Sequence, residues 1–233
     1  MSSVVSRNSD RAFFGAMTGM TFAVIFVGFA RTFYLKPPFD TPALGPLIQL
    51  HGVVATLWPM LIIVQVLLIR ARNYPLHRTL GMAGVVVAAM FVITAAMVVI
   101  GKQRPTEAAR AILILPLHQL VAFSLFVAAG IRFRREAASH KRLMYLATFI
   151  TVMNAMRRVE TLLDVTPSSP YQILIVAAAL LLLPLFFYDA FTLRRIHPTT
   201  WGGTLLIFAA IPLHSVVGYT AGWQNFADWL TNR

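Results

Sequence analysis

Seven long apolar stretches dominate this chain and limit what it can fold into. They cover roughly residues 12–33, 43–69, 76–101, 109–131, 140–158, 170–193 and 201–222. A helix needs about 20 apolar residues to cross the hydrocarbon core of a bilayer, and each stretch comes close to that length. The sequence therefore predicts an all-α integral membrane protein, a single domain over residues 1–233. Seven transmembrane helices are expected to form an up-down bundle around a core of helices 2–5.

Composition excludes several other classes of protein. Of the 233 residues, 58% are hydrophobic and only 12% are charged, which is too little charge for a soluble domain of this size. The chain has no cysteine, so disulfides and thiolate metal sites are excluded. The basic residues behind the net charge of +12 lie in short clusters between the apolar stretches. Such clusters are typical of loops that face anionic lipid, so membrane lipid rather than nucleic acid is the expected partner.

The positively charged residues predict the orientation of the bundle. With seven spans, the N-terminus shares one end of the bundle with loops 2–3, 4–5 and 6–7. Twelve of the 20 Lys and Arg residues fall at that end: Arg7, Arg11, Arg70, Arg72, Arg78, Arg132, Arg134, Arg135, Lys141, Arg142, Arg194 and Arg195. Because basic loops favour the cytoplasmic side, we expect this inner end in the cytoplasm of a bacterium. The opposite, outer end, with the C-terminus, is then on the periplasmic side of the inner membrane.

The segment PLHRTLG, residues 75–81, places a histidine and an arginine at the start of an apolar stretch, and the chain has six histidines in all. His51 and His118 each lie about seven residues inside the outer end of their predicted helices, or roughly 10 Å below the surface. His77 and His140 open the third and fifth stretches at the inner surface. Because helices 2 and 4 are parallel, as are helices 3 and 5, each pair of histidines can face one another across the bundle core.

These pairs suit a b-type haem, which takes two neutral imidazoles as axial ligands in an apolar slot and has cations near its propionates. The sequence predicts one site of His51 and His118 at the outer end and another of His77 and His140 at the inner end. Candidate cations are Arg31, Arg110, Arg157 and Arg158 at the outer end, and Arg78, Lys141 and Arg142 at the inner end. The outer site is favoured, because an ionisable side chain within the hydrocarbon generally has a function.

The pattern of four histidines, over about residues 45–160, resembles the di-haem transmembrane cytochromes b of the ascorbate-reducible family. The resemblance implies that haem b is the cofactor and that electrons pass from a quinol or small reductant to a further acceptor. It also implies that His51 and His118 ligate one haem and that His77 and His140 ligate the other. The segments LHRTLG and SHKRLM resemble, in addition, parts of uncharacterised bacterial multi-pass membrane proteins.

Two other functions fit the same residues. His214 is predicted at the depth of His51 and His118, and three histidines at one level could form a zinc or copper site with an open coordination position. Such a site loosely resembles the seven-span intramembrane zinc hydrolases, although their SxxxH and HxxxH pairs are missing here. Alternatively, the histidines could serve only as interhelical hydrogen-bonding groups in a non-catalytic scaffold or assembly factor. The sequence leaves open whether the protein is an enzyme.

Overall fold

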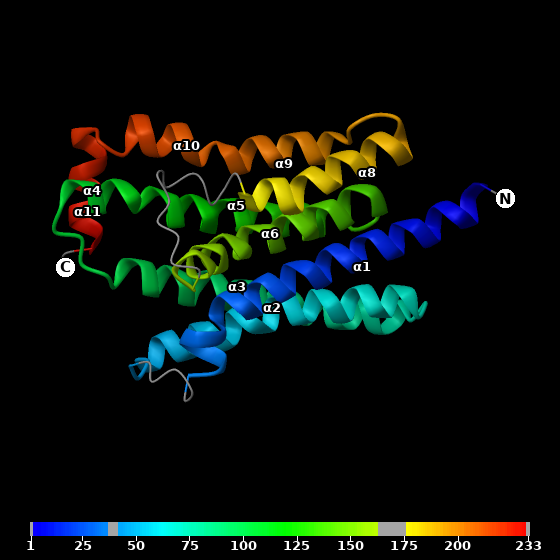
Figure 1. Cartoon of the computed structure of the whole chain (residues 1–233), viewed down its shortest axis with the longest axis horizontal. Helices are drawn as coiled ribbons and strands as arrows, with labels where there is room; N and C mark the ends of the chain where they lie inside the picture. The colour runs from blue at the N-terminus through cyan, green and yellow to red at the C-terminus, as the bar shows by residue number, and fades with distance from the viewer. Residues whose placement is uncertain (1, 37–41, 163–175, 232–233) are drawn as a thin grey trace.

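The computed structural model describes residues 2–36, 42–162 and 176–231, and this part of the chain is all-helical with no strand. Long helices run side by side along the longest axis of the molecule, and the last helix runs across one end of them (Figure 1). The prediction of an all-α bundle is therefore confirmed.

The helices match the predicted apolar stretches, with several local interruptions. In chain order they are α1 (Ser2–Phe29), η1 (Ala30–Tyr34), α2 (Pro46–Arg70), α3 (Tyr74–Ile100), α4 (Glu107–Ile112), α5 (Ile114–Arg132), α6 (Ala137–Leu162), η3 (Ala178–Leu182), α8 (Leu183–Leu193), α9 (Pro198–Phe208), α10 (Ala210–Pro212), η4 (Leu213–Val217) and α11 (Ala221–Thr231). The three segments labelled η are π-helical. Such widened turns often occur near functional sites, and two of them, η1 and η4, lie towards the outer end.

Five helices in the described part of the chain are long and apolar enough to cross a membrane, which identifies an integral membrane protein. They are Ser9–Tyr34, Pro46–Arg70, Tyr74–Ile100, Glu107–Arg132 and Pro198–Val217. Two predicted spans are not among them. The stretch 140–158 forms the less apolar α6, and the stretch 170–193 begins outside the described residues and continues as a shorter apolar helix. The structure thus supports a multi-pass protein without establishing seven crossings.

The helix α6 lies inside the bundle, which explains why it is less apolar than its neighbours. It packs against α1, α5, α9 and α2. Leu146, Ala147, Phe149, Val152 and Ala155 on α6 are completely buried. A helix that is covered by other helices can present polar groups to them, whereas a helix that faces lipid cannot do so without cost.

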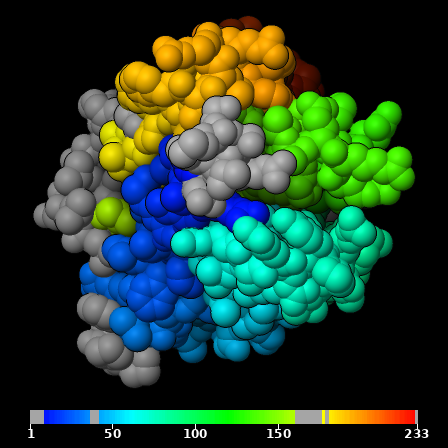
Figure 2. Space-filling model, turned by 90° about the vertical axis from the view of Figure 1, so that its right-hand side faces the viewer, coloured from blue at the N-terminus to red at the C-terminus, as the bar shows by residue number. Residues whose placement is uncertain are grey.

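The connections between helices lie at alternating ends of the bundle. The N-terminus, the α2–α3 turn, the α5–α6 turn and the α8–α9 turn share one end, while α4 and α11 lie at the other (Figure 1). Figure 2 looks onto the first of these ends and shows α2–α3 (cyan), the α5–α6 turn (green) and α8–α9 (yellow to orange) arranged around α1 (blue). This is the predicted distribution of loops, so we keep the names inner end and outer end. Which of them faces the cytoplasm remains a prediction.

A buried ion pair joins three helices at the inner end. Arg142 of α6 is 1% exposed and Asp189 of α8 is 0% exposed. The Nε of Arg142 donates to Oδ1 of Asp189 at 3.0 Å, and its Nη2 donates to the same oxygen. The other carboxylate oxygen accepts from the backbone N–H of His197 at 3.0 Å and from the hydroxyl of Thr200 at 2.6 Å. We call these four residues the inner ion-pair cluster.

The ion-pair cluster corrects part of the sequence prediction. Arg142, expected to bind a haem propionate, instead binds a carboxylate of the chain itself, and its Nη1 donates to the backbone oxygen of Ala138 at 2.8 Å. Lys141 is also engaged, because its Nζ lies 2.6 Å from Oδ2 of Asp10. Two of the three predicted inner cations, Lys141 and Arg142, therefore form ion pairs within the bundle.

Candidate ligand-binding site

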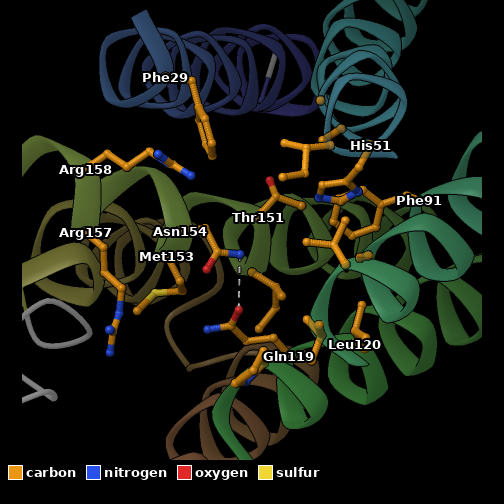
Figure 3. Close-up of a pocket in the computed structure, with 18 of the residues that line it drawn as sticks. Phe29, His51, Phe91, Gln119, Leu120, Thr151, Met153, Asn154, Arg157 and Arg158 are labelled. Carbon is orange, nitrogen blue, oxygen red and sulfur yellow. Dashed lines mark hydrogen bonds between the residues drawn. The ribbon is translucent and has the colours of Figure 1, made fainter. Parts of the chain in front are cut away.

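A cavity of about 640 Å³ lies at the outer end of the bundle, between α1, α2, α3, α5, α6 and α9. This volume falls in the usual range for small-molecule and cofactor sites. His51 and His118 both line it, as do Arg157 and Arg158. The structure thus brings four of the six residues predicted for the outer end to one cavity, and Figure 3 labels three of them, His51, Arg157 and Arg158.

The cavity lining is strongly cationic. Lys102 and Arg104 join Arg157 and Arg158 there, and none of the lining residues in the described part of the chain is Asp or Glu. The Nη1 of Arg158 donates to the hydroxyl of Thr32 at 3.2 Å, and its guanidinium lies over the ring of Phe29. Four cations without a carboxylate among them create a positive potential, which attracts an anionic group.

Sequence reasoning missed Lys102 and Arg104. Both follow the third apolar stretch at the outer end, so their level in the bundle was a usable signal. Burial lowers the pKa of the Arg104 guanidinium from its ordinary value, and its Nε is buried without a hydrogen-bond partner. A guanidinium remains charged at neutral pH even so, because its ordinary pKa lies far above neutrality. Arg104 therefore adds a permanent charge to the mouth of the cavity.

The ring of His51 is held in a defined tautomer. Its Nδ1 lies 3.1 Å from the hydroxyl oxygen of Thr94 on α3. That hydroxyl donates to the backbone oxygen of Met90 at 2.8 Å, so its proton is already used. It can then only accept from His51, which places a hydrogen on Nδ1 and leaves a lone pair on Nε2. A metal-binding histidine typically has this arrangement, with the opposite ring nitrogen donating to an oxygen.

His118 of α5 carries an unsatisfied ring nitrogen. Its Nε2 is buried and has no hydrogen-bond partner in the described structure, while the ring interacts with the backbone carbonyl of Leu206. An unpaired buried nitrogen of this kind costs about 1–3 kcal/mol and calls for an explanation such as a missing ligand. No ring contact or hydrogen bond joins His118 to His51 among the described residues. Any ligand common to both must therefore occupy the cavity that they share.

The two sides of the cavity differ in chemistry. Figure 3 shows His51 and Phe91 on one side and Arg157 and Arg158 on the other, with Asn154 between them. The Nδ2 of Asn154 lies 3.4 Å from Oε1 of Gln119, which links α6 to α5. An amphipathic molecule with an aromatic or apolar body and an anionic edge would match this division.

The remaining predicted cations of the outer end do not belong to the cavity. Arg110 donates through Nε to Oε1 of Gln224 at 2.8 Å and lies 3.7 Å from Asp228, so it ties α4 to α11. Arg31 is exposed and is not among the lining residues. These two arginines were placed correctly along the bundle, but the sequence could not tell which way their side chains point.

His77 and His140 meet at the inner end, as their matched depth predicted. Their ring centroids lie 6.5 Å apart and their planes are nearly perpendicular, at 88°. The Nδ1 of His140 lies 2.8 Å from the backbone oxygen of Gly130. Since a carbonyl only accepts, this Nδ1 carries the hydrogen and Nε2 carries the lone pair. Arg78, the third predicted inner cation, is exposed.

His214 does not join the outer pair. It is buried in η4, its ring lies 5.8 Å from that of Tyr219, and it is not among the residues that line the cavity. In the described part of the chain, no three His, Asp or Glu side chains gather closely enough to hold a metal ion. The alternative site of His51, His118 and His214 is therefore not assembled in this structure.

Comparisons of the chain with protein-family models, with curated proteins and with solved structures found no match. The fold and the site together define a class all the same: a multi-pass helical membrane protein with a cationic, histidine-bearing cavity at one end of its bundle. What such a cavity binds has to be argued from its chemistry.

Proposed function

We propose that this protein is a membrane cytochrome that binds haem b in the outer cavity and transfers electrons from a quinol or small reductant to a further acceptor. The observation that carries the proposal is the pair of histidines in one cavity, each with an Nε2 that makes no hydrogen bond within the described part of the chain. When bound, haem supplies reversible one-electron chemistry, which no side chain of this cavity can supply by itself.

His51 and His118 would hold the haem iron through Nε2. Neutral imidazole is the required form, and burial in an apolar bundle favours it. The Thr94 hydroxyl orients the first ring and the Leu206 carbonyl contacts the second. Groups of this kind fix the ring direction and raise its basicity, so they contribute to affinity without touching the iron.

The four cations of the cavity would bind the propionates. Arg157 and Arg158 lie on the side of the cavity away from His51, which suits a flat molecule with its carboxylates at one edge (Figure 3). Charge-assisted hydrogen bonds from guanidinium to carboxylate are among the stronger polar interactions in proteins. A positive potential also favours the reduced haem, which carries one positive charge fewer, so these residues would raise the reduction potential.

The proposal extends to the membrane topology. We infer that α6 and the helix that continues to Leu193 also cross the bilayer, which gives seven spans, because α6 is shielded from lipid by its neighbours. With the basic residues on the cytoplasmic side, the N-terminus is cytoplasmic and the C-terminus periplasmic in a bacterial inner membrane. A topology reporter fused after Arg233 should report the periplasmic side, and activity on the cytoplasmic side would contradict this arrangement.

Paired substitutions test the haem site. In purified protein, His51→Ala and His118→Ala should each remove the same component of the reduced-minus-oxidised visible spectrum. His214→Ala is the matched control, because His214 is also a buried histidine near the outer end but does not line the cavity. It should leave haem content near that of the wild type. Retention of the component in either cavity variant would overturn the assignment of axial ligands.

The absence of Asp and Glu from the described residues of the cavity lining supports a second candidate, an anionic amphiphile such as a phospholipid or fatty acid. Its head group would pair with the four cations, and its chain would occupy the apolar part of the cavity. In that case the purified protein would be colourless and would carry a stoichiometric lipid, which native mass spectrometry detects. The two histidine variants would then affect lipid retention less than Arg157→Gln and Arg158→Gln.

A further inference from the structure

A second polar cluster lies at the inner end and is not explained by the outer site. It consists of His77 on α3, His140 on α6 and Gln65 on α2. Gln65 is only 9% exposed, and neither its Nε2 nor its Oε1 has a hydrogen-bond partner in the described structure. The Nδ1 of His77 is also buried without a partner. We call these three residues the inner histidine cluster.

The three side chains converge on a small region. The Gln65 amide reaches towards α3, because its Nε2 lies 4.0 Å from the position that a Cβ would take at Gly81. Gly81 is four residues, or about one helical turn, beyond His77. The His77 ring itself interacts with the backbone of Gln65, and it is in ring contact with His140. The rings of His77 and His140 thus meet at the start of α3, and the Gln65 amide lies beside the next turn of the same helix.

Packing alone does not account for this cluster. Buried polar side chains in proteins are nearly always hydrogen-bonded, and an amide with two unused polar atoms is a clear exception. The polar residues of the inner ion-pair cluster, at the same end of the bundle, pair with one another through several short hydrogen bonds. The unpaired Oε1 of Gln65 and the unpaired Nδ1 of His77 therefore point to a bound group that accepts lone pairs, whereas the Nε2 of Gln65 only donates and would pair with water beside that group.

The geometry of the His77 and His140 rings is compatible with a metal ion as the bound group. A metal ion lies about 2.0–2.1 Å from a histidine nitrogen, which places it roughly 3.2 Å from the centre of the ring. Two imidazoles on one ion can therefore have centroids up to about 6.4 Å apart when they lie on opposite sides of it. The observed separation of His77 and His140 is 6.5 Å, so the rings would close by a few tenths of an ångström for a linear pair and by roughly 1.3 Å for the tetrahedral angle that Zn²⁺ prefers.

The orientation of His140 agrees with this geometry. Its Nδ1–H donates to the backbone oxygen of Gly130 at 2.8 Å, which leaves Nε2 as the nitrogen that can coordinate. This is the support that metal-binding histidines usually receive. Neutral imidazole together with an amide oxygen suits Zn²⁺ and copper, and the chain has no cysteine to compete for them.

We propose that His77, His140 and the Gln65 amide oxygen bind one first-row transition-metal ion at the inner end, with water completing its coordination. This site lies at the opposite end of the bundle from the outer cavity and does not depend on haem binding there.

Metal titration of the full-length protein in detergent tests the proposal. After treatment with a chelator, the protein should bind about one equivalent of Zn²⁺ or Cu⁺, measured by competition with a chromogenic chelator. His77→Ala and His140→Ala should each weaken binding at least about 100-fold, since each removes a ligand, and Gln65→Leu should weaken it about tenfold. His197→Asn is the control, because it removes another histidine of the inner end and should leave the affinity unchanged.

X-ray absorption and the melting temperature give two further tests of the metal site. X-ray absorption of the Zn²⁺-loaded protein should show two imidazoles and no sulfur at the metal. The melting temperature of the wild type should rise with added Zn²⁺, because an ion that binds only the folded state stabilises it, and that of Gln65→Leu should rise less. Gln65→Leu replaces a buried amide by an apolar side chain of similar size, so it should remain folded even if a histidine variant does not.

Three results would overturn the proposal. The first is the absence of any stoichiometric binding of Zn²⁺ or Cu⁺ by the wild type. The second is unchanged affinity in folded His77→Ala or His140→Ala. The third is loss of a haem absorption component in His77→Ala with no metal bound, which would assign the pair to haem. Failure of the outer haem site would appear instead in the His51 and His118 variants, so the two proposals can fail separately.

Discussion

The inner ion-pair cluster and the outer cavity are two ways in which one bundle buries charge. In the ion-pair cluster, Asp189 receives hydrogen bonds from Arg142, from Thr200 and from the backbone of His197, and no solvent reaches it. In the outer cavity, four cations line an open volume whose described lining residues include no Asp or Glu, and the Nε2 of His118 has no hydrogen-bond partner in the described structure. The charge of Arg142 is thus balanced by a carboxylate of the chain, whereas the charged side chains of the described cavity lining are all positive.

This difference in charge pairing suggests different roles. The residues of the inner ion-pair cluster stabilise the fold, and the residues of the outer cavity are those that we propose to bind a ligand. Removing one member of a complete, buried set leaves the others without partners, so the cost appears in folding. Arg158 contacts Thr32 and His51 contacts Thr94, but Arg158 and His51 border an open cavity, so the main cost of removing one should appear in ligand binding instead. The predictions below use this contrast.

The largest expected effect is on folding at the ion-pair cluster. Asp189→Ala leaves the guanidinium of Arg142 buried without its carboxylate, which should destabilise the protein by about 3–5 kcal/mol. Thermal unfolding in detergent measures this loss. Asp10→Ala is the control, because the pair of Asp10 with Lys141 is partly exposed, and pairs of this kind contribute only about 0–1 kcal/mol. Equal stability of Asp189→Ala and wild type would contradict the role of the cluster.

The next effect concerns the orientation of His51. Thr94→Val keeps the shape of the side chain but removes the acceptor for the His51 Nδ1–H, and loss of such a support typically costs 10–100-fold in metal affinity. We therefore expect haem affinity to fall by roughly that factor with little change in melting temperature. Thr18→Val on α1 is matched, since Thr18 is buried and its hydroxyl donates to the backbone of Phe14 in the same manner. If both variants lose haem equally, the effect is not specific to His51.

A smaller effect is expected from the cavity arginines. Arg157→Gln and Arg158→Gln each remove one positive charge, which should lower haem affinity about fivefold to tenfold and shift the reduction potential downwards. Spectroelectrochemical titration measures the potential. Arg110→Gln serves for comparison, because Arg110 is bound to Gln224 outside the cavity. A shift caused by Arg110→Gln as large as that of the cavity variants would contradict the assignment of the propionate side.

The smallest effect is a pH dependence at the inner end. His197 caps α9, since its Nδ1 accepts from the backbone N–H of Thr199 at 3.2 Å, and a protonated Nδ1 cannot accept. Burial lowers the pKa of His197 from 6.5, and nearby Arg142 lowers it further. As the pH falls below 6.5, the unfolded chain takes up this proton before the folded chain does, so stability is present above that pH and decreases below it. The loss levels off once the folded state is protonated as well.

His197→Asn isolates this contribution. Asparagine is a good N-cap residue and does not titrate, so the variant should keep the cap of α9 and lose this part of the pH dependence. We expect the difference in stability between pH 7.5 and pH 5 to be smaller in the variant by about 1 kcal/mol or less. Parallel pH profiles of the melting temperature in wild type and variant would show that the cap does not titrate in this range.

Much of the fold was predictable because hydropathy and loop charge are local signals. The all-helical bundle, the alternation of its ends and the common level of each histidine pair follow from the lengths of the apolar stretches. The cavity at His51 and His118 was anticipated in position for the same reason. The sequence favoured this outer pair, yet the structure brings the inner pair His77 and His140 into ring contact.

What the sequence could not provide depends on the direction of side chains and on pairing across the bundle. Arg142 and Asp189 are 47 residues apart, and no spacing or motif in the sequence predicts their contact. The central position of α6 was not predicted either. Its lower hydropathy suggested a marginal transmembrane span, whereas in the structure its neighbouring helices cover it. Lys102 and Arg104 were passed over because a loop residue can point into a cavity or away from it.

The most direct test of the central claim is the haem content of the wild-type protein, expressed with an adequate supply of haem precursor and purified in mild detergent. The pyridine haemochrome assay gives the amount of haem b per chain. One haem per chain, with a reduced spectrum that is typical of two imidazole ligands, is the result that we predict. A colourless protein with no Soret band would contradict the assignment of the outer cavity to haem.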